Sequence, residues 1–249
     1  MKKIHDMDTY TPIAASDLTY EQKRKALYAL FFLTKKINVD IKERKVADGS
    51  KKRTFEGYIK SDAASPTLST DWLLITCAID GYEICDVVVA DMPGAFLNTD
   101  NPDYVLMCLR VKLAEMVVRV DPKLHRNYVM TSAKGEPILY VKLNKALYGL
   151  LKSDLLFYKK LVGELEGMGF KINIYDPCVA NRMKICSQQT VMWHVDDLKI
   201  SHVEPMVNTD FLLKLANIYG PGINLSRGKV HDYLGMDIYY SSRGKVKIP

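Results

Sequence analysis

The sequence predicts an α+β fold, in which an antiparallel sheet carries two helices on one face. From residue 82 onward the apolar patterns follow the order strand, helix, strand, strand, helix, strand, which is typical of a βαββαβ core. Hydrophobic residues make up 48% of the 249 residues, enough for a folded core and too many for a disordered chain. This length favours one large or bilobed domain, 1–249.

The first quarter of the chain predicts a helix followed by a hairpin. Thr19 and Gln22 match a capping box, and the helix that they begin is expected to continue to Thr34. Residues 37–41 and 53–59 are expected to pair as strands around a turn at residues 48–50, Asp-Gly-Ser.

A continuous apolar run at residues 82–90 predicts a strand that is buried on both faces. The strand ends at Asp91 and so delivers a carboxylate at its C-terminal end, although a role for Asp91 as a cap or turn former is the alternative. Other elements expected in this part of the chain are a helix from Ser69 or Thr70 to about Ala78, a short helix or turn at 95–98, strands at 104–110 and 138–143, a helix at 112–119 and an irregular segment at 122–127.

The second half predicts the rest of the sheet and its two helices. Ser153 is expected to cap a helix over residues 154–168, which has an apolar stripe and ends at Gly169. The elements expected after it are strands at 177–183, 190–195 and 198–203, a helix capped by Asn208 or Thr209, and a strand within 229–240.

Two adjacent carboxylates, Asp196 and Asp197, lie between two of these strands, where a hairpin turn is expected. Most Asp pairs at turns are solvated turn formers that bond their own backbone. Here the predicted strand order places the hairpin beside the strand that ends at Asp91. Three convergent acids can hold two Mg²⁺ ions about 4 Å apart, which is the apparatus for in-line phosphoryl transfer.

The charge distribution permits a polyanionic partner without requiring one. The formal net charge is +6, with 35 Lys and Arg against 29 Asp and Glu. Two basic clusters in the first quarter hint at a phosphate-facing lobe, and they contain Lys23, Arg24, Lys25, Lys35 and Lys36, then Lys42, Arg44, Lys45, Lys51, Lys52 and Arg53. Such runs are more often solvated faces.

The five cysteines have no CxxC spacing, which favours reduced core thiols in an intracellular protein. A zinc site at Cys178, Cys186 and His194 is disfavoured, because these spacings do not make a compact knuckle. No apolar run approaches the roughly 18 residues that span a bilayer, and no secretory signal is expected at the N-terminus.

Several motifs resemble the reverse transcriptases of copia-type LTR retrotransposons. The segment Asp91-Met-Pro-Gly-Ala-Phe-Leu-Asn98 resembles their first catalytic motif, and 143–153, Leu-Asn-Lys-Ala-Leu-Tyr-Gly-Leu-Leu-Lys-Ser, with 157–159 resembles the second. Val195-Asp196-Asp197 resembles the catalytic turn, while 176–178 and 233–236 fit the flanking motifs. The resemblance is clearest over residues 48–248.

The resemblance implies a right-hand polymerase with fingers at about 17–82 and 103–140 and a palm at about 83–102 and 141–249. The palm would be the antiparallel, ferredoxin-like sheet. It implies RNA-directed DNA synthesis, by nucleotidyl transfer from dNTPs to a primer 3′-hydroxyl on an RNA or DNA template. Implied partners include integrase and RNase H domains of a polyprotein, and the implied location is cytoplasmic, in virus-like particles.

The resemblance also implies residue roles. Asp91, Asp196 and Asp197 would be the catalytic acids and ligands of Mg²⁺, or of Mn²⁺ in its place, and the Met92 carbonyl would complete one coordination sphere. Phe96 falls where the family places the steric gate against a ribose 2′-hydroxyl, with simple packing as the alternative. The remaining implied contacts are Tyr148 and Gly149 in the nucleotide pocket, Lys51 and Arg53 on the triphosphate, and Lys214 as a proton donor to pyrophosphate.

The sequence departs from the family pattern at His194, where Tyr is usual, and at Asp154, where Pro is common. Little chain is expected to remain for a thumb, and no RNase H region is expected. A truncated or degenerate copy that binds nucleic acid without catalysis is therefore the alternative function. A metal-dependent nuclease would need the same acids, but no nuclease motif is present.

Overall fold

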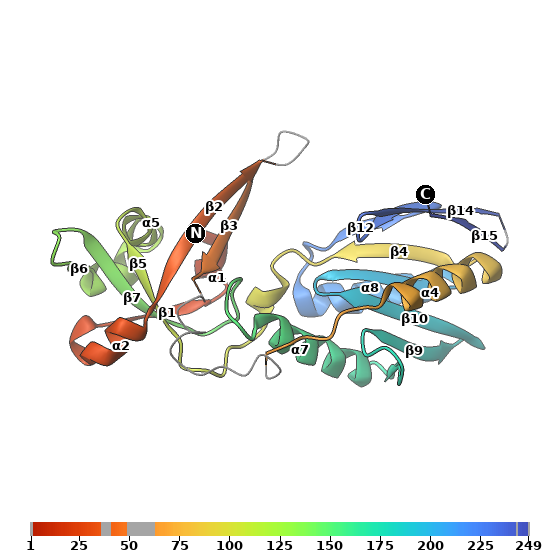
Figure 1. Ribbon diagram of the computed structural model, residues 1–249, viewed down its shortest axis with the longest axis horizontal. Coiled ribbons are helices and arrows are strands. Elements are labelled where there is room, and N and C mark those ends of the chain that lie inside the picture. Colours follow the sequence, from red (N-terminus) through yellow and green to blue (C-terminus); the bar gives the residue numbers. More distant parts are fainter. Residues whose placement is uncertain (1, 36–40, 49–62, 243, 249) are drawn as a thin grey trace. The chain divides into compact units, whose positions relative to one another are not determined.

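The computed structural model describes residues 2–35, 41–48, 63–242 and 244–248 (Figure 1). The chain divides into two compact units. The first unit contains Met1–Ala64 and Phe96–Phe157, and the second contains Ser65–Ala95 and Tyr158–Pro249. Their assignment to fingers and palm stays a prediction.

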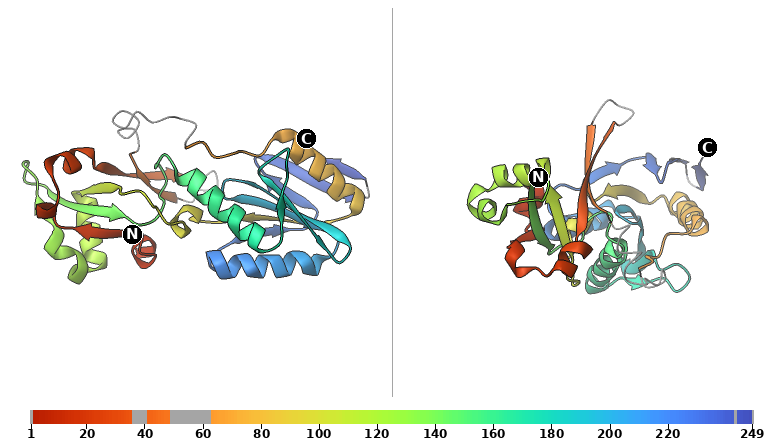
Figure 2. Two further views of the ribbon diagram at one scale, coloured as in Figure 1. Left: turned by 90° about the horizontal axis from the view of Figure 1, so that it is seen from below. Right: turned by 60° about the vertical axis from the view of Figure 1, so that its left-hand side comes forward.

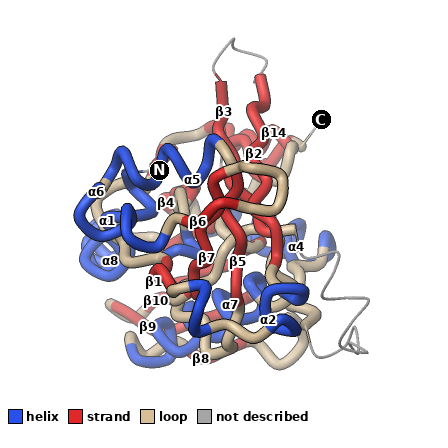
Figure 3. The backbone as a smooth tube through the Cα atoms, turned by 90° about the vertical axis from the view of Figure 1, so that its left-hand side faces the viewer, coloured by secondary structure: helices blue, strands red, loops and turns tan. Residues whose placement is uncertain are grey.

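The first unit is built on a six-stranded sheet in the order β1-β7-β5-β2-β3, with β6 paired to β7. Figure 3 shows β5, β6 and β7 running together in this sheet. The strands are β1 (Tyr10–Ile13), β2 (Leu27–Lys35), β3 (Ile41–Ala47), β5 (Leu106–Arg110), β6 (Met130–Thr131) and β7 (Pro137–Leu143). The helices are α1 (Lys2–Asp6), α2 (Tyr20–Lys25), α5 (Lys112–Val120) and α6 (Pro122–His125), with 3-10 turns η1 (Ala15–Asp17), η3 (Ala95–Asn98) and η4 (Arg126–Tyr128).

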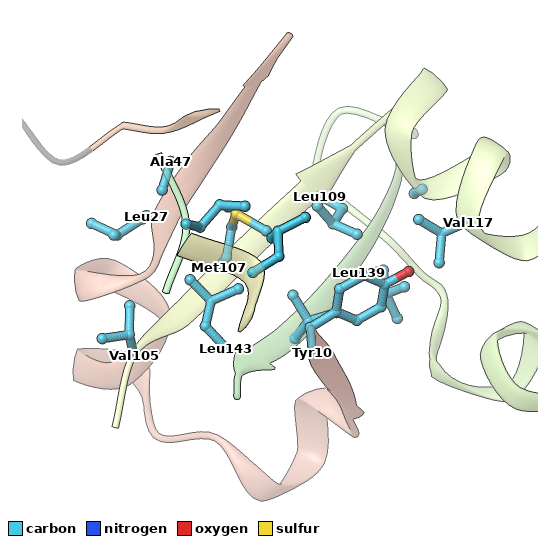
Figure 4. Close-up of a cluster of buried hydrophobic side chains, with 13 residues drawn as sticks. Tyr10, Leu27, Ala47, Val105, Met107, Leu109, Val117, Leu139 and Leu143 are labelled. Carbon is cyan, nitrogen blue, oxygen red and sulfur yellow. The ribbon is translucent and has the colours of Figure 1, made fainter. Parts of the chain in front are cut away.

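The core of the first unit lies between this sheet and α5 (Figure 4). Leu139, Val141 and Leu143 alternate along β7 with the less buried Tyr140 and Lys142, and all three are fully buried. Ala114 and Val117 of α5 are equally buried, and they share the cluster with Met107 and Leu109 of β5. The buried residues are spaced two apart in β7 and three apart in α5, which are the spacings that place side chains on one face of a strand and of a helix.

The helix predicted to continue to Thr34 is wrong beyond Lys25. Thr19 does form the predicted capping box, because its side chain accepts from the Gln22 N–H while the Gln22 side chain accepts from the Thr19 N–H. The chain then enters β2, which pairs parallel with β5 and antiparallel with β3. A short apolar run fits a buried strand as well as a helix, and pairing with two strands decided the outcome. The predicted strand at 53–59 lies outside the described residues.

The second unit is built on a sheet in the order β12-β4-β11-β10-β9-β8. The strands are β4 (Asp86–Asp91), β8 (Lys171–Ile172), β9 (Val179–Lys184), β10 (Ser187–His194), β11 (Asp197–His202) and β12 (Asn224–Arg227). All its pairings are antiparallel, as predicted, and β11 pairs directly with β4. The predicted adjacency of the Asp91 strand and the Asp196 hairpin is therefore confirmed.

Helices cover both faces of this second sheet. On one face, Tyr158 of α7 (Ser153–Gly167) contacts Trp193 of β10, and Asn208 of α8 (Pro205–Tyr219) donates to Asp86 of β4. The two helices predicted on one face do lie there, but a third helix covers the opposite face, so the prediction that helices cover one face alone is wrong. Helix α4 (Thr70–Glu83) lies on the opposite face (Figure 2). Its Thr76 hydroxyl contacts the Met192 sulfur of β10. After β12, the chain forms a separate three-stranded antiparallel sheet of β13 (Val230–Tyr233), β14 (Met236–Ser242) and β15 (Lys245–Lys247).

Several predicted boundaries in the second unit are wrong. The strand predicted from residue 82 begins at Asp86, because α4 continues to Glu83 and ends at Ile84 in a left-handed conformation (φ 58°). Helix α8 begins at Pro205 rather than after Asn208 or Thr209, because proline suits the first helical position. Asn208 is buried inside that helix, where its side chain bonds to β4.

Two predicted features of the first unit also need correction at the residue level. The segment 122–127, predicted to be irregular, contains α6, whose first turn is capped by Asp121 accepting from the Leu124 N–H. Ser153 does not act as the predicted cap: its hydroxyl donates to the Leu147 carbonyl, 2.7 Å away.

None of the helices in the described ranges is both long and apolar enough to span a bilayer.

Two buried histidines predict a pH dependence of stability. Burial lowers the pKa of His125 and of His231 below the ordinary value of 6.5. The unfolded chain therefore binds more protons than the folded chain near pH 6. The free energy of unfolding is expected to fall as the pH drops through about 6.5, and to be insensitive to these groups at higher pH.

We expect His125→Leu to raise the free energy of unfolding by about 1 kcal/mol at pH 7.5 and to flatten its pH dependence. Neither ring nitrogen of the fully buried His125 has a hydrogen-bond partner among the described residues. His202 is the matched control, because it is equally buried but its nitrogens bond to Glu204 and Lys184. Urea unfolding at pH 7.5 and 5.5 measures the free energy of unfolding of His125→Leu and of the control variant His202→Leu. An equal loss of stability in both would contradict the role given to His125.

Candidate active site

The predicted carboxylates meet at the ends of neighbouring strands in the second unit. Asp197 of β11 lies directly opposite Asp91 of β4. On their outer sides, Asp197 pairs with His194 of β10 and Asp91 pairs with Asn224 of β12. Residues directly opposite in an antiparallel sheet point to the same face. His194, Asp197, Asp91 and Asn224 therefore form one row across four strands, which we call the carboxylate row.

Asp196 lies beside this row in the turn between β10 and β11. Its backbone carbonyl accepts from the Met92 N–H at 3.1 Å, which extends the pairing of the two strands by one step. Val195, the other turn residue, has φ 57°. A β-branched residue in the left-handed region is strained by about 1–3 kcal/mol, and such strain clusters at functional sites.

The charges of the carboxylate row are close together and partly accessible. Asp91, Asp196 and Asp197 are all half-buried, so a ligand can reach them from solvent. Two carboxylates directly opposite in a sheet repel each other. The Asn224 amide donates to Asp91 Oδ2 at 3.0 Å, which orients that carboxylate but leaves its charge. The arrangement therefore favours a bound cation.

Neighbouring groups fix the backbone of the row. The hydroxyl of Tyr233, a residue of the 233–236 motif, donates to the Asp197 carbonyl at 3.2 Å. Tyr233 is 1% exposed, and burial raises the pKa of its hydroxyl, which therefore remains a donor. Asp176 of the other flanking motif is also buried, and its carboxylate accepts from the Ser69 and Cys178 N–H groups.

The donor set suits a cation that keeps most of its water. In the described parts of the chain, no group of three or more His, Cys, Asp or Glu side chains is arranged to hold a metal ion. This applies to Cys178, Cys186 and His194 and also to the three predicted acids, which by themselves form no complete set of metal ligands there. Mg²⁺ is usually bound through one or two carboxylates with waters and substrate phosphates. The Met92 carbonyl accepts from the Ala95 N–H at 3.1 Å, and a carbonyl oxygen has a second lone pair.

The predicted nucleotide-pocket residues come together in the first unit. The rings of Phe96 and Tyr148 lie edge to face with centroids 4.5 Å apart, and Phe157 packs on Phe96 at 6.0 Å. Phe96 is 2% exposed, so packing accounts for its position in the structure. The gate role of Phe96 stays a prediction.

Gly149 needs to be glycine for a local reason. Its φ is 90°, and a Cβ atom there would collide with the Ala47 carbonyl and the Val46 side chain. The adjacent Tyr148 carbonyl accepts from the Ala47 N–H at 2.8 Å, which ties this loop to the end of β3. The glycine therefore lets the second predicted motif approach the β2–β3 hairpin closely.

We expect Gly149→Ala to lower the free energy of unfolding by about 2 kcal/mol or more, because both the backbone angle and the collision oppose a side chain. Gly163→Ala is the matched control. Gly163 lies in α7, and a Cβ atom added there would meet no atom within 4 Å, so alanine should raise stability by about 0.5–1 kcal/mol. Urea unfolding measures both changes, and equal effects would contradict the close approach.

Of the other residues singled out in the sequence, the structure gives a position for Lys214, Asp154 and His194. Lys51 and Arg53 lie outside the described residues. Lys214 is exposed on α8, and Asp154 is exposed in the first turn of α7, where a carboxylate is favourable. His194 belongs to the carboxylate row.

Sequence reasoning missed two polar groups that the structure brings to this site. Asn224 bonds to Asp91, and only its place at the start of a short edge strand could have pointed to it. Lys199, two residues after Asp197, forms a buried ion pair with Asp80 of α4. A lysine within the apolar run that follows Asp197 was the available signal.

Comparisons with known proteins show the fold. No family model matches the sequence, and no curated protein matches it. Telomerase from Candida albicans, solved in complex with a TWJ fragment of telomeric RNA, matches with TM-score 0.51 and 10% identity, over 99% of this chain and 49% of that chain. Apo telomerase from Candida tropicalis matches with TM-score 0.49 and 10% identity, over 99% and 52%.

The chain thus spans about half the length of the telomerases that it resembles. Telomerase is a polymerase related to reverse transcriptases. The similarity covers nearly all of this chain. The chain has a reverse-transcriptase-like polymerase fold of the α+β class.

Proposed function

We propose that this chain is the RNA-directed DNA polymerase of a copia-type retrotransposon. The observation that carries the proposal is the carboxylate row, in which Asp91 and Asp197 face each other beside Asp196 at the strand ends. The polymerase-like fold and the copia-like motifs around these residues support it. The proposed reaction transfers a nucleotidyl group from a dNTP to a primer 3′-hydroxyl.

Asp91, Asp196 and Asp197 are proposed to hold two Mg²⁺ ions together with water and the phosphates of the substrate, with Mn²⁺ as a substitute. Bound there, Mg²⁺ would lower the pKa of the primer 3′-hydroxyl and neutralise the leaving pyrophosphate. Asp91 and Asp197 hold their carboxylates on one face of a rigid sheet, which suits precise positioning of two oxygen atoms. Asp196 adds a third carboxylate from the turn.

The partner is proposed to be an RNA or DNA template–primer. Templated synthesis reads sequence by base pairing, so the protein needs contacts with the backbone and the shape of the pair. The net charge of +6 favours such contacts. Tyr148, Gly149, Lys51 and Arg53 are proposed to contact the incoming dNTP, and Lys214 to protonate pyrophosphate. Attachment to integrase and RNase H domains, and location in virus-like particles, belong to the same proposal.

Primer extension tests the proposal. The full chain is incubated with a primed RNA template, Mg²⁺ and dNTPs, and template–primer binding is measured separately by fluorescence anisotropy. Extension to the template end is expected. Binding without extension would contradict the proposal and favour a degenerate copy, and cleavage of the template without dNTPs would favour a nuclease.

We expect Phe96→Val to raise incorporation of ribonucleotides relative to deoxyribonucleotides by about tenfold or more, because a smaller side chain would admit the 2′-hydroxyl. Phe157→Leu is the matched control. Phe157 shares the aromatic cluster and is equally buried, so its truncation should lower stability without changing sugar selectivity. Single-nucleotide extension with dNTPs and rNTPs measures the ratio. An unchanged ratio for Phe96→Val would leave packing as the role of Phe96.

A further inference from the structure

A short edge strand holds both ends of the strand that carries Asp91. Strand β12 pairs with β4, and its four side chains are exposed. At one end, Asn224 donates to Asp91 Oδ2 at 3.0 Å. At the other end, Arg227 donates to both carboxylate oxygens of Asp86, at 2.8 and 2.7 Å.

The chemistry at the two ends differs. Arg227 and Asp86 form a bidentate ion pair, which is specific in geometry and roughly twice as strong as a neutral hydrogen bond. An amide at Asn224 instead holds the Asp91 carboxylate without neutralising it. A Lys or Arg at this position would compete with a metal ion for the same charge. One amide donor also leaves Asp91 most of its lone pairs for another ligand.

The Arg227 end is tied further into the second unit. The guanidinium also donates to the Pro205 carbonyl at 2.8 Å and to Thr209 Oγ1 at 3.0 Å, both in α8. Asp86 accepts another hydrogen bond from Asn208 of the same helix, at 2.9 Å. The exposed strand β12 is therefore anchored to α8 as well as to β4, although its own side chains bury little surface.

We propose that Asn224 is a positioning residue, which orients the Asp91 carboxylate for cation binding, and that Arg227 anchors the strand that presents it. This inference rests on the proposed function, because it assigns a divalent cation to Asp91. Hydrogen bonds to metal-binding carboxylates set their orientation, and their loss typically weakens metal binding 10–100-fold.

Binding of Mn²⁺ to the full chain, followed by electron paramagnetic resonance of the free ion, tests the inference without requiring activity. We expect Asn224→Ala to raise the Kd for Mn²⁺ about tenfold. Asn224→Leu keeps the approximate shape of asparagine without its donor, and it should weaken binding equally. The matched control is Ser226→Ala, two residues along the same face of β12, which should bind Mn²⁺ like the parent chain.

The dependence of the extension rate on Mg²⁺, compared with its dependence on dNTP, gives a second test. In primer extension, Asn224→Ala should raise the Mg²⁺ concentration for half-maximal rate about tenfold, with a smaller change in the KM for dNTP. Thermal unfolding without metal should match the parent chain, because Asn224 is exposed. Equal Mn²⁺ affinity in parent, Asn224→Ala and Asn224→Leu would overturn the inference and leave the proposed function standing. A parent chain that neither binds Mn²⁺ nor extends primers would overturn both.

Discussion

Asp91→Asn, Asp196→Asn and Asp197→Asn are each expected to lower the rate of primer extension about 10³-fold or more. Each change would remove the charge of a carboxylate that is proposed to bind Mg²⁺, and three decades in rate correspond to about 4 kcal/mol of lost transition-state stabilisation. Single-turnover extension on a primed RNA template measures this loss. Asp237→Asn is the control, because Asp237 is an exposed carboxylate of β14 in the same unit.

The stability of two of these variants should change in the opposite direction. Asp91 and Asp197 lie directly opposite each other, and facing like charges destabilise a sheet by up to about 1 kcal/mol. Replacing either with Asn should therefore raise the free energy of unfolding slightly in metal-free buffer. Loss of activity together with loss of fold would contradict this account, because the effect could then be ascribed to misfolding.

Lys199→Met is expected to lower the free energy of unfolding by about 3–5 kcal/mol. Lys199 and Asp80 are 1% and 3% exposed and form an ion pair between β11 and α4. Tyr240 of β14 also donates to Asp80, at 3.3 Å. Removing the lysine leaves a buried carboxylate with only that hydroxyl as a side-chain donor among the described residues, which strongly disfavours the folded state.

A double-mutant cycle separates the pair from its surroundings. Adding Asp80→Asn to Lys199→Met removes the uncompensated charge and keeps an acceptor for Tyr240, so the double variant should be more stable than Lys199→Met alone. Lys25→Met is the contrasting control: Lys25 pairs with Glu21 on the surface of α2, where the loss should be under about 0.5 kcal/mol. Urea unfolding gives all the values. A loss below about 1 kcal/mol for Lys199→Met would contradict the buried pair.

The sequence was sufficient to predict the antiparallel sheet and the meeting of its acids. The apolar run before Asp91 and the strands around Asp196 both have clear patterns, and their pairing follows from the element order. The sequence failed where a short apolar run fitted two kinds of element, as in β2, and where a helix ran past its expected end, as in α4. In both cases pairing and packing with distant residues, rather than local preference, decided the outcome.

The sequence pointed to the acidic residues of the candidate site but not to the residues that hydrogen-bond to the strands around it. Asp91, Asp196 and Asp197 could be found because paired acids at strand ends are a recognisable pattern. Asn224, Arg227 and Lys199 could not, because their roles depend on partners more than 100 positions away in the chain. The residues next to a single Asn or Arg on a polar strand do not indicate which distant residue it will bind.

The separation of Asn224 from Asp91 has a consequence for synthesis of the chain on the ribosome. The two residues are 133 positions apart, and among the described strands β4 pairs with two that are made after it, β11 and β12. At typical elongation rates, β4 is complete on the order of 10 s before β12 emerges. Neither edge of this valine-rich strand has its native partner until β11 emerges, and the other edge waits for β12; such open edges are prone to intermolecular pairing. Slower translation between the two segments should therefore increase aggregation rather than assist folding.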